Sequence, residues 1–391
     1  MPVEDRLCDV PRAPHLLILV SNGEFLLSHR REIAVHARGA GFKVTVACPI
    51  DGARETIEAL GIRHLPIPMR RKGSTLWSEL RTIASIRTIL LAERPDVVHL
   101  ITAKPIIYGG LWTRLFGIPA VTAVPGLGYL FANRGLRVGL LRELVVQGYR
   151  FAVGGLRSHL VFQNADDLAI FRERAILKHD RFTMIAGSGV DLEAIRPTPL
   201  PDGPVVVVLP ARLLRDKGVI EFVEAARILK ARGIDAVFRL LGDPDVGNPT
   251  SISMADLAEW QDAGLIEWHP HTSDIGSALA RAHIVALPSY REGFPKTLID
   301  AAAAGRPSVT SNVPGCRDAI VEGETGILIK ARDARSLADG LEPLIANRDT
   351  QIRMGQAARA HAEHNFDVRD VCARHLEIYS NLVGVGKYAP C

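Results

Sequence analysis

Two carboxylates, eight positions apart, flank the stretch of this sequence that is best suited to bind a phosphate. Glu292 lies in a tight loop after an apolar segment at 283–287, and Asp300 lies in the helix that follows. Pro295 suits the first position of that helix, where its missing N–H costs nothing. The helix dipole and the first free N–H groups then form an anion site at the carboxyl end of a strand. Those N–H groups belong to Lys296, Thr297 and Leu298.

The two carboxylates suit sugars better than phosphates. Ionised carboxylates only accept hydrogen bonds, so they pair well with sugar hydroxyls and poorly with a phosphate. We therefore expect Asp300 to bind a ribose and Glu292 to bind the hydroxyls of a second sugar. The alternative is that Glu292 only complements the helix dipole and that Asp300 is solvated. The carboxylates alone leave both interpretations open.

Two cations add to this stretch. Arg212 and Lys217 lie in the turn after an apolar strand at 205–209. At one crevice, two cations and a helix N-terminus would bind a diphosphate and stabilise the negative charge of a leaving phosphate. The whole set predicts a site for a nucleoside diphosphate sugar, whereas the simpler alternative makes Arg212 and Lys217 surface charges.

The composition is that of a globular protein with two hydrophobic cores. The chain has 391 residues, of which 47% are hydrophobic and 23% are charged. It has no apolar run of about 18 residues that would span a membrane. The five cysteines show no metal-binding spacing, and the first residues lack an apolar signal core, so we expect a cytoplasmic protein. A net charge of +4 gives no reason to expect nucleic acid as a partner.

Strand and helix patterns alternate in two successive runs, with a proline-rich break between them. This arrangement predicts an α/β protein with two doubly wound domains facing each other across a cleft, where ligands bind. We expect residues 1–198 to form the first domain and 199–365 the second. A C-terminal helix within 366–391 would cross back to the first domain.

The first domain offers polar groups beside its strand ends. Gly23 follows a strand at 15–20 without a G-x-G-x-x-G fingerprint, so it either lets a ligand approach the backbone or is a plain turn glycine. Lys104 is expected in a loop after a strand at 95–100, where it would meet an anion or be solvated. His99, inside that strand, is expected to be a core histidine.

A long helix is expected at 135–156, with a basic edge. Arg142, Arg150 and Arg157 recur near every second turn and share one arc with apolar neighbours. Such a face can lie on an anionic bilayer. The alternative is a helix that packs on the core and leaves its arginines in solvent.

Several segments together resemble a known family. These are PARLLRDKG at 210–218, EGFPKTLID at 292–300, VVHLITAKP at 97–105, VFQNADD at 161–167 and IAGSGVD at 185–191. They resemble the retaining glycosyltransferases with the E-x7-E signature (glycosyltransferase family 4), over about residues 14–380. PGLGYLF at 125–131 is similar to the bacterial subgroup that adds a hexose or N-acetylhexosamine to a polyprenyl-diphosphate-linked sugar in capsule, O-antigen or glycan precursors.

The resemblance implies the GT-B fold, with two Rossmann-like domains, and gives roles to single residues. Arg212 and Lys217 would bind the donor diphosphate and Glu292 would orient the donor sugar, which makes these three the expected catalytic groups. Asp300 would bind the ribose, although the family normally has the longer glutamate there. Further donor contacts are expected from Gly23, His271, Phe294, Pro295, Lys296, Thr297 and Leu298. Basic groups expected to meet the lipid diphosphate of the acceptor are His29, Arg30, Arg71 and Lys104.

The resemblance also implies a mechanism and partners. Transfer would retain the anomeric configuration, with the leaving phosphate acting as base, and it would need no metal or other cofactor. The partners would be a nucleotide sugar, with UDP favoured by the subgroup, a polyprenyl-diphosphate-linked acceptor, and the inner membrane, with which the protein would associate peripherally. Val124 stands where many relatives carry a histidine, so no residue is assigned to face the reacting carbon.

Two other functions fit the same architecture. A UDP-sugar 2-epimerase of GT-B fold would need neither an acceptor nor a membrane face, and the basic stretches at 70–72 and 134–157 weigh against it. A non-catalytic two-lobed sugar-binding protein would be secreted, and this chain lacks a signal peptide.

Overall fold

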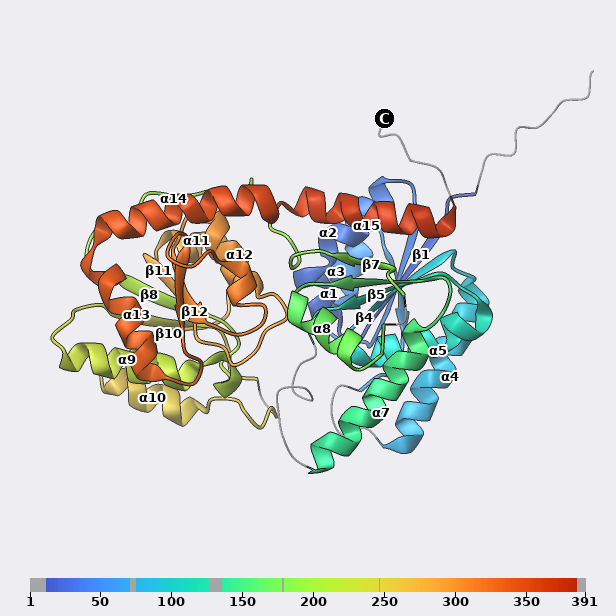
Figure 1. Ribbon diagram of the computed structural model, residues 1–391, viewed down its shortest axis with the longest axis horizontal. Helices are drawn as coiled ribbons and strands as arrows, with labels where there is room; N and C mark the ends of the chain where they lie inside the picture. Colours follow the sequence, from blue (N-terminus) through green and yellow to red (C-terminus); the bar gives the residue numbers. More distant parts are fainter. Residues whose placement is uncertain (1–11, 71–74, 127–135, 178, 246, 385–391) are drawn as a thin grey trace, which may run out of the picture. The chain divides into compact units, whose positions relative to one another are not determined.

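The computed structural model describes residues 12–70, 75–126, 136–177, 179–245 and 247–384 (Figure 1). By its contacts the chain divides into two compact units. Unit 1 comprises Met1–Ala123, Gln147–Leu160 and Arg374–Cys391, and unit 2 comprises Val124–Val146 and Val161–Ala373. These units do not follow the boundary expected near residue 198, because Leu192 and Ile195 of the proline-rich stretch pack in the core of unit 2.

The first sheet has the strand order β3-β2-β1-β4-β5-β6-β7, and β1 pairs in parallel with both β2 and β4. Most of its strands are buried on both faces, as expected of a parallel sheet covered by helices. The strands are β1 (His15–Val20), β2 (Lys43–Cys48), β3 (Arg63–Pro66), β4 (Val97–Ile101), β5 (Ala120–Val124), β6 (Ser158–Phe162) and β7 (Phe182–Met184).

The helical segment after β1 is divided into two by Arg30, which leaves helical geometry at φ −138°. One expectation for these helices is wrong. Lys104 was expected in a loop, but it lies in the first turn of a helix. The helices are α1 (Gly23–His29), α2 (Arg31–Gly39), α3 (Arg54–Ala59), α4 (Leu76–Glu93), α5 (Ala103–Phe116), α7 (Leu136–Val153) and α8 (Ala165–Glu173).

The last helix, α15 (Val368–Val383), contributes its residues from Arg374 onward to unit 1. There Tyr379 packs edge-on against Phe42, and its hydroxyl shares a 2.7 Å hydrogen bond with Nδ1 of His99. His99 is fully buried, and burial holds its pKa well below the ordinary value, with His375 and Arg30 adding to the effect. The prediction that His99 is a core histidine is confirmed.

The second sheet has the strand order β10-β9-β8-β11-β12-β13. Its central strand β11 lies between β8 and β12 and is parallel to both. The strand β12 could not be predicted, because its segment SVTS has one apolar residue and therefore no strand pattern. The strands are β8 (Val206–Pro210), β9 (Val237–Leu241), β10 (Glu267–His269), β11 (Ile284–Leu287), β12 (Ser308–Ser311) and β13 (Gly326–Ile329).

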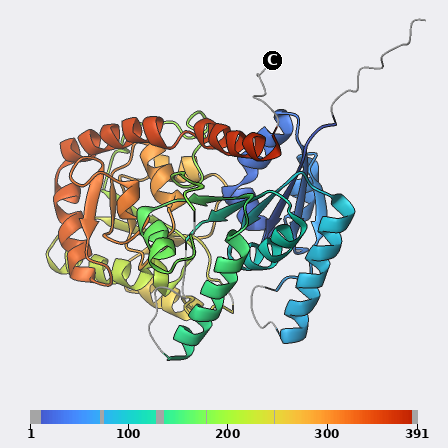
Figure 2. The same cartoon turned by 45° about the vertical axis from the view of Figure 1, so that its right-hand side comes forward.

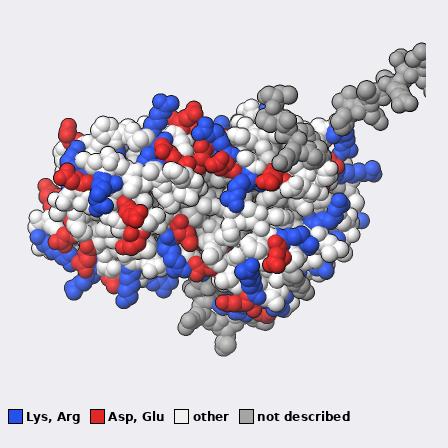
Figure 3. Space-filling view, turned by 45° about the horizontal axis from the view of Figure 1, so that its top comes forward, with Lys and Arg blue, Asp and Glu red and all other residues white. Residues whose placement is uncertain are grey.

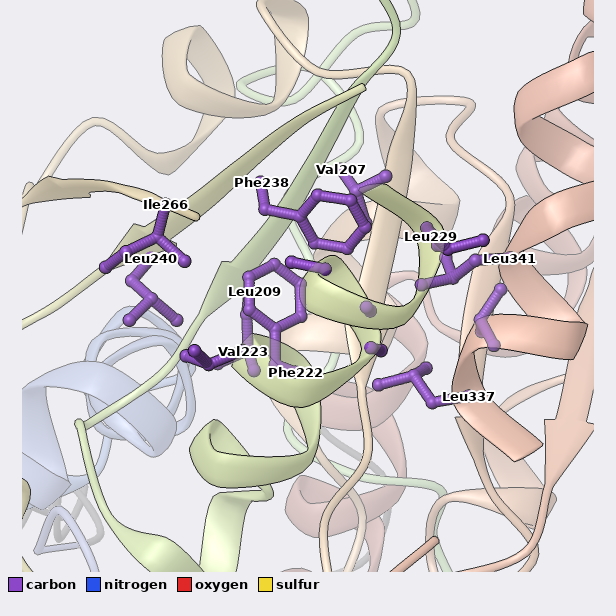
Figure 4. Packing of buried hydrophobic residues seen from close by; sticks show 14 of the residues in the cluster. Val207, Leu209, Phe222, Val223, Leu229, Phe238, Leu240, Ile266, Leu337 and Leu341 are labelled. Carbon is purple, nitrogen blue, oxygen red and sulfur yellow. The ribbon is translucent and has the colours of Figure 1, made fainter. Parts of the chain in front are cut away.

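Two hydrophobic clusters, one on each face, hold this sheet between helices. On one face, Phe222 and Phe238 pack edge to face, 5.2 Å between ring centroids, beside Leu337 and Leu341 (Figure 4). On the other face, the alanine-rich helix α12 packs against the long helix α14. The helices are α9 (Val219–Ala231), α10 (Met254–Asp262), α11 (Ile275–Ala280), α12 (Lys296–Ala303), α13 (Ala334–Ala346) and α14 (Arg348–Asn365).

Charge is spread evenly over the face shown in Figure 3, where acidic and basic side chains alternate without a large area of one sign. Among the described helices, none combines the length and the hydropathy needed to cross a bilayer.

Candidate active site

The candidate site lies where two neighbouring strands of unit 2 end. β11 leads through the loop 288–295 into α12, and β8 leads into the turn at 211–218. The hydroxyl of Thr297 donates a 2.8 Å hydrogen bond to the carbonyl oxygen of Pro210, which fixes the start of α12 beside the end of β8. The carboxyl ends of parallel strands therefore bring the two predicted stretches together, as the sequence predicts.

The start of α12 differs in detail from the prediction. Pro295 is the N-cap, at φ −74° and ψ 121°, and the helix begins at Lys296. The N–H of Leu298 already donates to the carbonyl oxygen of Pro295 at 3.1 Å, so the prediction that it is free is wrong. The first two N–H groups, of Lys296 and Thr297, have no recorded acceptor in the described part of the chain. These two groups, with the helix dipole, remain available to an anion.

Lys217 and Glu292 contact each other directly. The Lys217 ammonium donates to Oε1 of Glu292 at 2.5 Å, and the hydroxyl of Ser289 donates to the same oxygen at 2.7 Å. The two charged side chains are 22% and 12% exposed, so the pair is mostly shielded from water. The sequence predicts separate roles for these residues, but in this structure the cation and the carboxylate neutralise each other.

Arg212 is the more accessible cation of the site. Its guanidinium pairs with Oδ2 of Asp245 at 2.9 Å, and its side chain is 50% exposed. An exposed ion pair of this kind contributes little to stability, about 0–1 kcal/mol, so a diphosphate can replace Asp245 as the partner of Arg212 at small cost.

Asp300 is buried rather than solvated. It is 4% exposed and accepts a 2.6 Å hydrogen bond from the ammonium of Lys296, one turn earlier in α12. Burial raises the pKa of Asp300, and the charge and hydrogen bond of Lys296 partly oppose that effect. The alternative of a solvated Asp300 is therefore wrong.

The remaining predicted donor residues of unit 2 have different surroundings. Phe294 is buried and packs edge-on against Phe366, so only its backbone could reach a ligand. Leu298 is fully buried, and its N–H is already bonded to Pro295. His271 is exposed, and its N–H donates to Asp243 at 3.1 Å.

The predicted residues of unit 1 are largely occupied by neighbours. The N–H of Gly23 donates to Asp51 at 2.7 Å, and a Cβ at this position would clash with that side chain. Gly23 therefore accommodates Asp51, and the expectation of a ligand at its backbone is not supported. His29 stacks on Phe25 and contacts the hydroxyl of Ser28.

Two of the basic residues expected to bind the acceptor lie in other settings. Arg30 is 2% exposed and donates to the carbonyl oxygen of His29, so in this structure its side chain is not presented to an acceptor, and nothing supports the predicted contact with a lipid diphosphate. The ammonium of Lys104 donates to Glu79 at 2.5 Å and to the carbonyl oxygen of Arg70 at 2.8 Å, which neutralises its charge. Arg71 lies outside the described residues.

Three further residues contact the site and were not predicted from the sequence. Ser289 shares the carboxylate of Glu292 with Lys217, Asp245 pairs with Arg212, and Asn164 donates to the carbonyl oxygen of Gly293 at 2.7 Å. A signal was present for Ser289, which lies three residues before Glu292 in the same loop. Nothing in the local sequence links Asn164 to a loop 129 positions away.

Comparison with known proteins identifies the class. Residues 15–153 match the family model described as "Glycosyl transferase 4-like", and residues 191–361 match "Glycosyl transferases group 1". The chain belongs to this glycosyltransferase family and is a glycosyltransferase.

Curated relatives cover most of the chain. An N,N'-diacetylbacillosaminyl-diphospho-undecaprenol alpha-1,3-N-acetylgalactosaminyltransferase of Campylobacter jejuni is 25% identical, over 87% of this chain and 92% of its own length. A UDP-Gal:alpha-D-GlcNAc-diphosphoundecaprenol alpha-1,3-galactosyltransferase of Escherichia coli is 23% identical, over 88% and 90%.

Solved structures share the fold. A sucrose-phosphate synthase from Thermosynechococcus elongatus superposes with a TM-score of 0.79 at 16% identity, over 95% of this chain and all of that one. HepE of Anabaena, solved with UDP and glucose, gives 0.76 at 18% identity, over 94% and 100%. The predicted α/β fold of GT-B type, with two doubly wound parallel sheets, is confirmed.

The burial of Asp300 gives a prediction for stability against pH. Because its folded-state pKa lies above the unfolded value, its contribution to stability is fully present below the unfolded pKa and is lost as pH rises through the folded pKa. Asp300→Asn should therefore gain stability relative to the wild type as pH rises from about 4 to 7, measured by urea unfolding.

Asp256→Asn is the matched control with the opposite sign. Hydrogen bonds from Ser253 hold the pKa of Asp256 below its ordinary value, so its contribution is present at high pH and is lost as pH falls. This variant should lose stability relative to the wild type as pH rises toward about 4, the unfolded value, and should show little further change between about 4 and 7. A stability difference for Asp300→Asn that does not change with pH would contradict the assignment of a buried, raised-pKa carboxyl.

Proposed function

We propose that this glycosyltransferase moves a hexose or N-acetylhexosamine from a uridine diphosphate sugar to a polyprenyl-diphosphate-linked saccharide, with retention of configuration, in the synthesis of a surface polysaccharide or glycan precursor. The observation that carries the proposal is the pairing of Lys217 with Glu292 beside the N-terminus of α12, at the ends of β8 and β11. A cation for the diphosphate and a carboxylate for the sugar are thus held within one hydrogen bond of each other.

Binding of the donor would separate Lys217 from Glu292. The ammonium of Lys217 would turn to the diphosphate, together with Arg212 and the free N–H groups of Lys296 and Thr297. The carboxylate of Glu292 would then accept hydrogen bonds from sugar hydroxyls, while Ser289 continues to orient it. Asp300 would meet the ribose only if Lys296 moves off its carboxylate.

The reaction would need most help at the leaving group. As the bond between the anomeric carbon and the β-phosphate oxygen breaks, negative charge collects on the diphosphate, where Lys217, Arg212 and the α12 dipole stabilise it. The acceptor hydroxyl would attack from the same face and pass its proton to the leaving phosphate oxygen. We propose that these side chains balance the diphosphate charge without a resident metal or other cofactor, which activity measured with excess chelator tests.

The choice of substrates rests on the relatives. The Escherichia coli relative is named for UDP-Gal and an undecaprenol-linked acceptor, and the Campylobacter relative for an undecaprenol-linked acceptor. A UDP-sugar 2-epimerase or a non-catalytic binding protein is not favoured, because the relatives that span this chain are named as transferases.

A surface of unit 1 supports the inner membrane as the place of action. At the start of α4, Leu76 is 76% and Trp77 is 81% exposed, and Arg81 lies one turn further on the same helix, exposed and with no ion pair recorded among the described residues. An open groove of about 910 Å³ borders Trp77 and Arg81 and is lined by Ile50, Arg70 and other residues, none of them acidic.

The same layer of helices continues this surface. α4 and α5 pack together, as Figure 2 shows, with Arg87 over the ring of Trp112. Leu115 and Phe116 are exposed at the end of α5, a helix without any acidic residue. Exposed apolar side chains among unopposed arginines are suited to an anionic bilayer. The helix α7, expected to provide such a face, buries Val146, Tyr149 and Val153.

Titration with nucleotides tests the donor site. UDP should bind the wild type more tightly than GDP, and Arg212→Ala should weaken UDP binding about tenfold or more, because charge-assisted hydrogen bonds contribute about 1.5–3 kcal/mol. Arg215→Ala, which removes an exposed arginine of the same turn, should change the Kd less than twofold. Equal losses in both variants, or no nucleotide binding at all, would contradict the proposed donor site.

Vesicle binding tests the membrane surface. The double variant Leu76→Ser, Trp77→Ser should lose at least about tenfold in affinity for anionic phospholipid vesicles, because each buried CH₂ group contributes about 0.8 kcal/mol. Ile352→Ser, which removes an exposed residue of α14 in unit 2, is the control and should leave the affinity unchanged. Equal vesicle binding by the double variant and the wild type would show that membrane association does not use this surface.

A further inference from the structure

The loop that carries Glu292 is held on both sides by the first turn of α8. The side-chain amide of Asn164, the N-cap of α8, donates to the carbonyl oxygen of Gly293 at 2.7 Å. The guanidinium of Arg291 donates to Oδ1 of Asp167 at 2.6 Å. Arg291 and Gly293, on either side of Glu292, are therefore both held by the segment 164–167.

The orientation of Asn164 is determined by its cap. Its Oδ1 accepts from the N–H of Asp167 at 2.8 Å, so its amide nitrogen must be the atom that faces Gly293. That nitrogen also donates to Oδ2 of Asp167 at 3.1 Å. Asn164 is 2% and Asp167 0% exposed, so water cannot easily replace either contact.

The Asp167–Arg291 ion pair is buried, so forming it requires the removal of two charges from water. Burial raises the pKa of Asp167, while Arg291 and Asn164 oppose that effect. A buried ion pair seldom adds net stability over apolar packing, but it fixes geometry, because removing one partner leaves an uncompensated charge. We therefore expect the ion pair to fix the position of Arg291 rather than to add stability.

Backbone packing leaves the loop little freedom. A Cβ on Gly293 would lie 1.6 Å from the carbonyl oxygen of Pro125, and a Cβ on Gly315 would lie 2.5 Å from the carbonyl oxygen of Gly293. The N–H of Glu292 donates to the carbonyl oxygen of Pro314 at 3.3 Å. Segments 125–126 and 314–315 thus confine the loop, and the α8 turn fixes it by hydrogen bonds.

We infer that Asn164 and Asp167 are positioning residues, which hold residues 293 and 291 so that the Glu292 carboxylate faces Lys217 and the donor sugar. The inference rests on the proposed function, in which Glu292 binds that sugar. A carboxylate that must act on one hydroxyl pattern loses efficiency when it moves by about 1 Å, whereas Arg212 lies in another turn and Thr297 fixes the start of α12 to the carbonyl oxygen of Pro210.

The same turn provides a matched control. Asp166 pairs with Arg317 through both carboxylate oxygens at 2.7 Å, but this pair is about one-third exposed and does not touch residues 291–293. Asp166→Asn removes one charge from the same helix terminus as Asp167→Asn. Effects that arise from the cap or the dipole should therefore appear in both variants.

The test compares Asn164→Ser and Asp167→Asn with Asp166→Asn. Serine keeps the cap acceptor but lacks the amide that reaches Gly293. Each variant is titrated with UDP, UDP-galactose, UDP-N-acetylgalactosamine and UDP-glucose. Hydrolysis of the tightest-binding sugar nucleotide, with water as the acceptor, releases UDP and the free sugar and gives kcat. The Asn164→Ser change is also made in a Glu292→Gln background, as a double-mutant cycle.

We expect the variants to lose kcat and the affinity contributed by the sugar, but not the affinity for UDP. Asn164→Ser and Asp167→Asn should keep the affinity for UDP within about twofold but lose about tenfold in kcat and in the extra affinity that the sugar provides. In the Glu292→Gln background, Asn164→Ser should change kcat less than about twofold, because the carboxylate it positions is gone. Asp166→Asn should resemble the wild type.

Other outcomes would overturn the inference. An unchanged kcat in folded Asn164→Ser and Asp167→Asn, an equal loss in both backgrounds, or a fall in UDP affinity as large as the loss of the sugar increment would each show a general structural role. If one of the two variants does not fold, the other decides. If the wild type binds none of the four nucleotides, the proposed function fails and this inference falls with it, whereas the outcomes above leave the proposed function intact.

Discussion

The 2.5 Å contact between Lys217 and Glu292 is the interaction around which unit 2 is arranged. A cation and a carboxylate that are mostly shielded from water stabilise each other, so neither carries an unopposed charge before a ligand arrives. In the proposed function, both must be released, Lys217 to bind a diphosphate and Glu292 to bind a sugar. On that proposal, the ligand that separates Lys217 from Glu292 must satisfy the charge of both side chains.

The rest of the unit supplies the geometry that keeps this pair together. Parallel strands end at the same edge of the sheet, so β8 brings Lys217 and β11 brings Glu292 to one place. Thr297 ties α12 to the end of β8, while Asn164 and Arg291 tie the Glu292 loop to α8. Small residues are needed wherever these backbones meet, which explains the glycine at 293 between two neighbouring chain segments.

Much of the fold could be predicted from the sequence because apolar residues recur at the spacings typical of strands and helices. The valine-rich strand β8 (Val206–Pro210) lies within one residue of the predicted 205–209, and the alanine-rich helix after Pro295 appears as predicted. The polar strand SVTS at 308–311 carries no such pattern. The position of Lys217, Glu292 and Arg212 after the ends of two strands could be predicted from the sequence, whereas their chemical roles stay predictions. Their partners could not be predicted, since Asn164 and Asp245 reach the site through tertiary packing, and Arg30 and Lys104 gave no local sign of being buried or neutralised.

The measurement that tests the central claim most directly is a calorimetric titration of UDP and of its sugar conjugates into the wild type and into Glu292→Gln. If Lys217 serves the diphosphate and Glu292 the sugar, the variant should bind UDP at least as tightly as the wild type, because its lysine no longer faces a carboxylate. The additional affinity that the sugar provides should be lost. A variant that binds UDP more weakly and keeps the contribution of the sugar would contradict this division of roles.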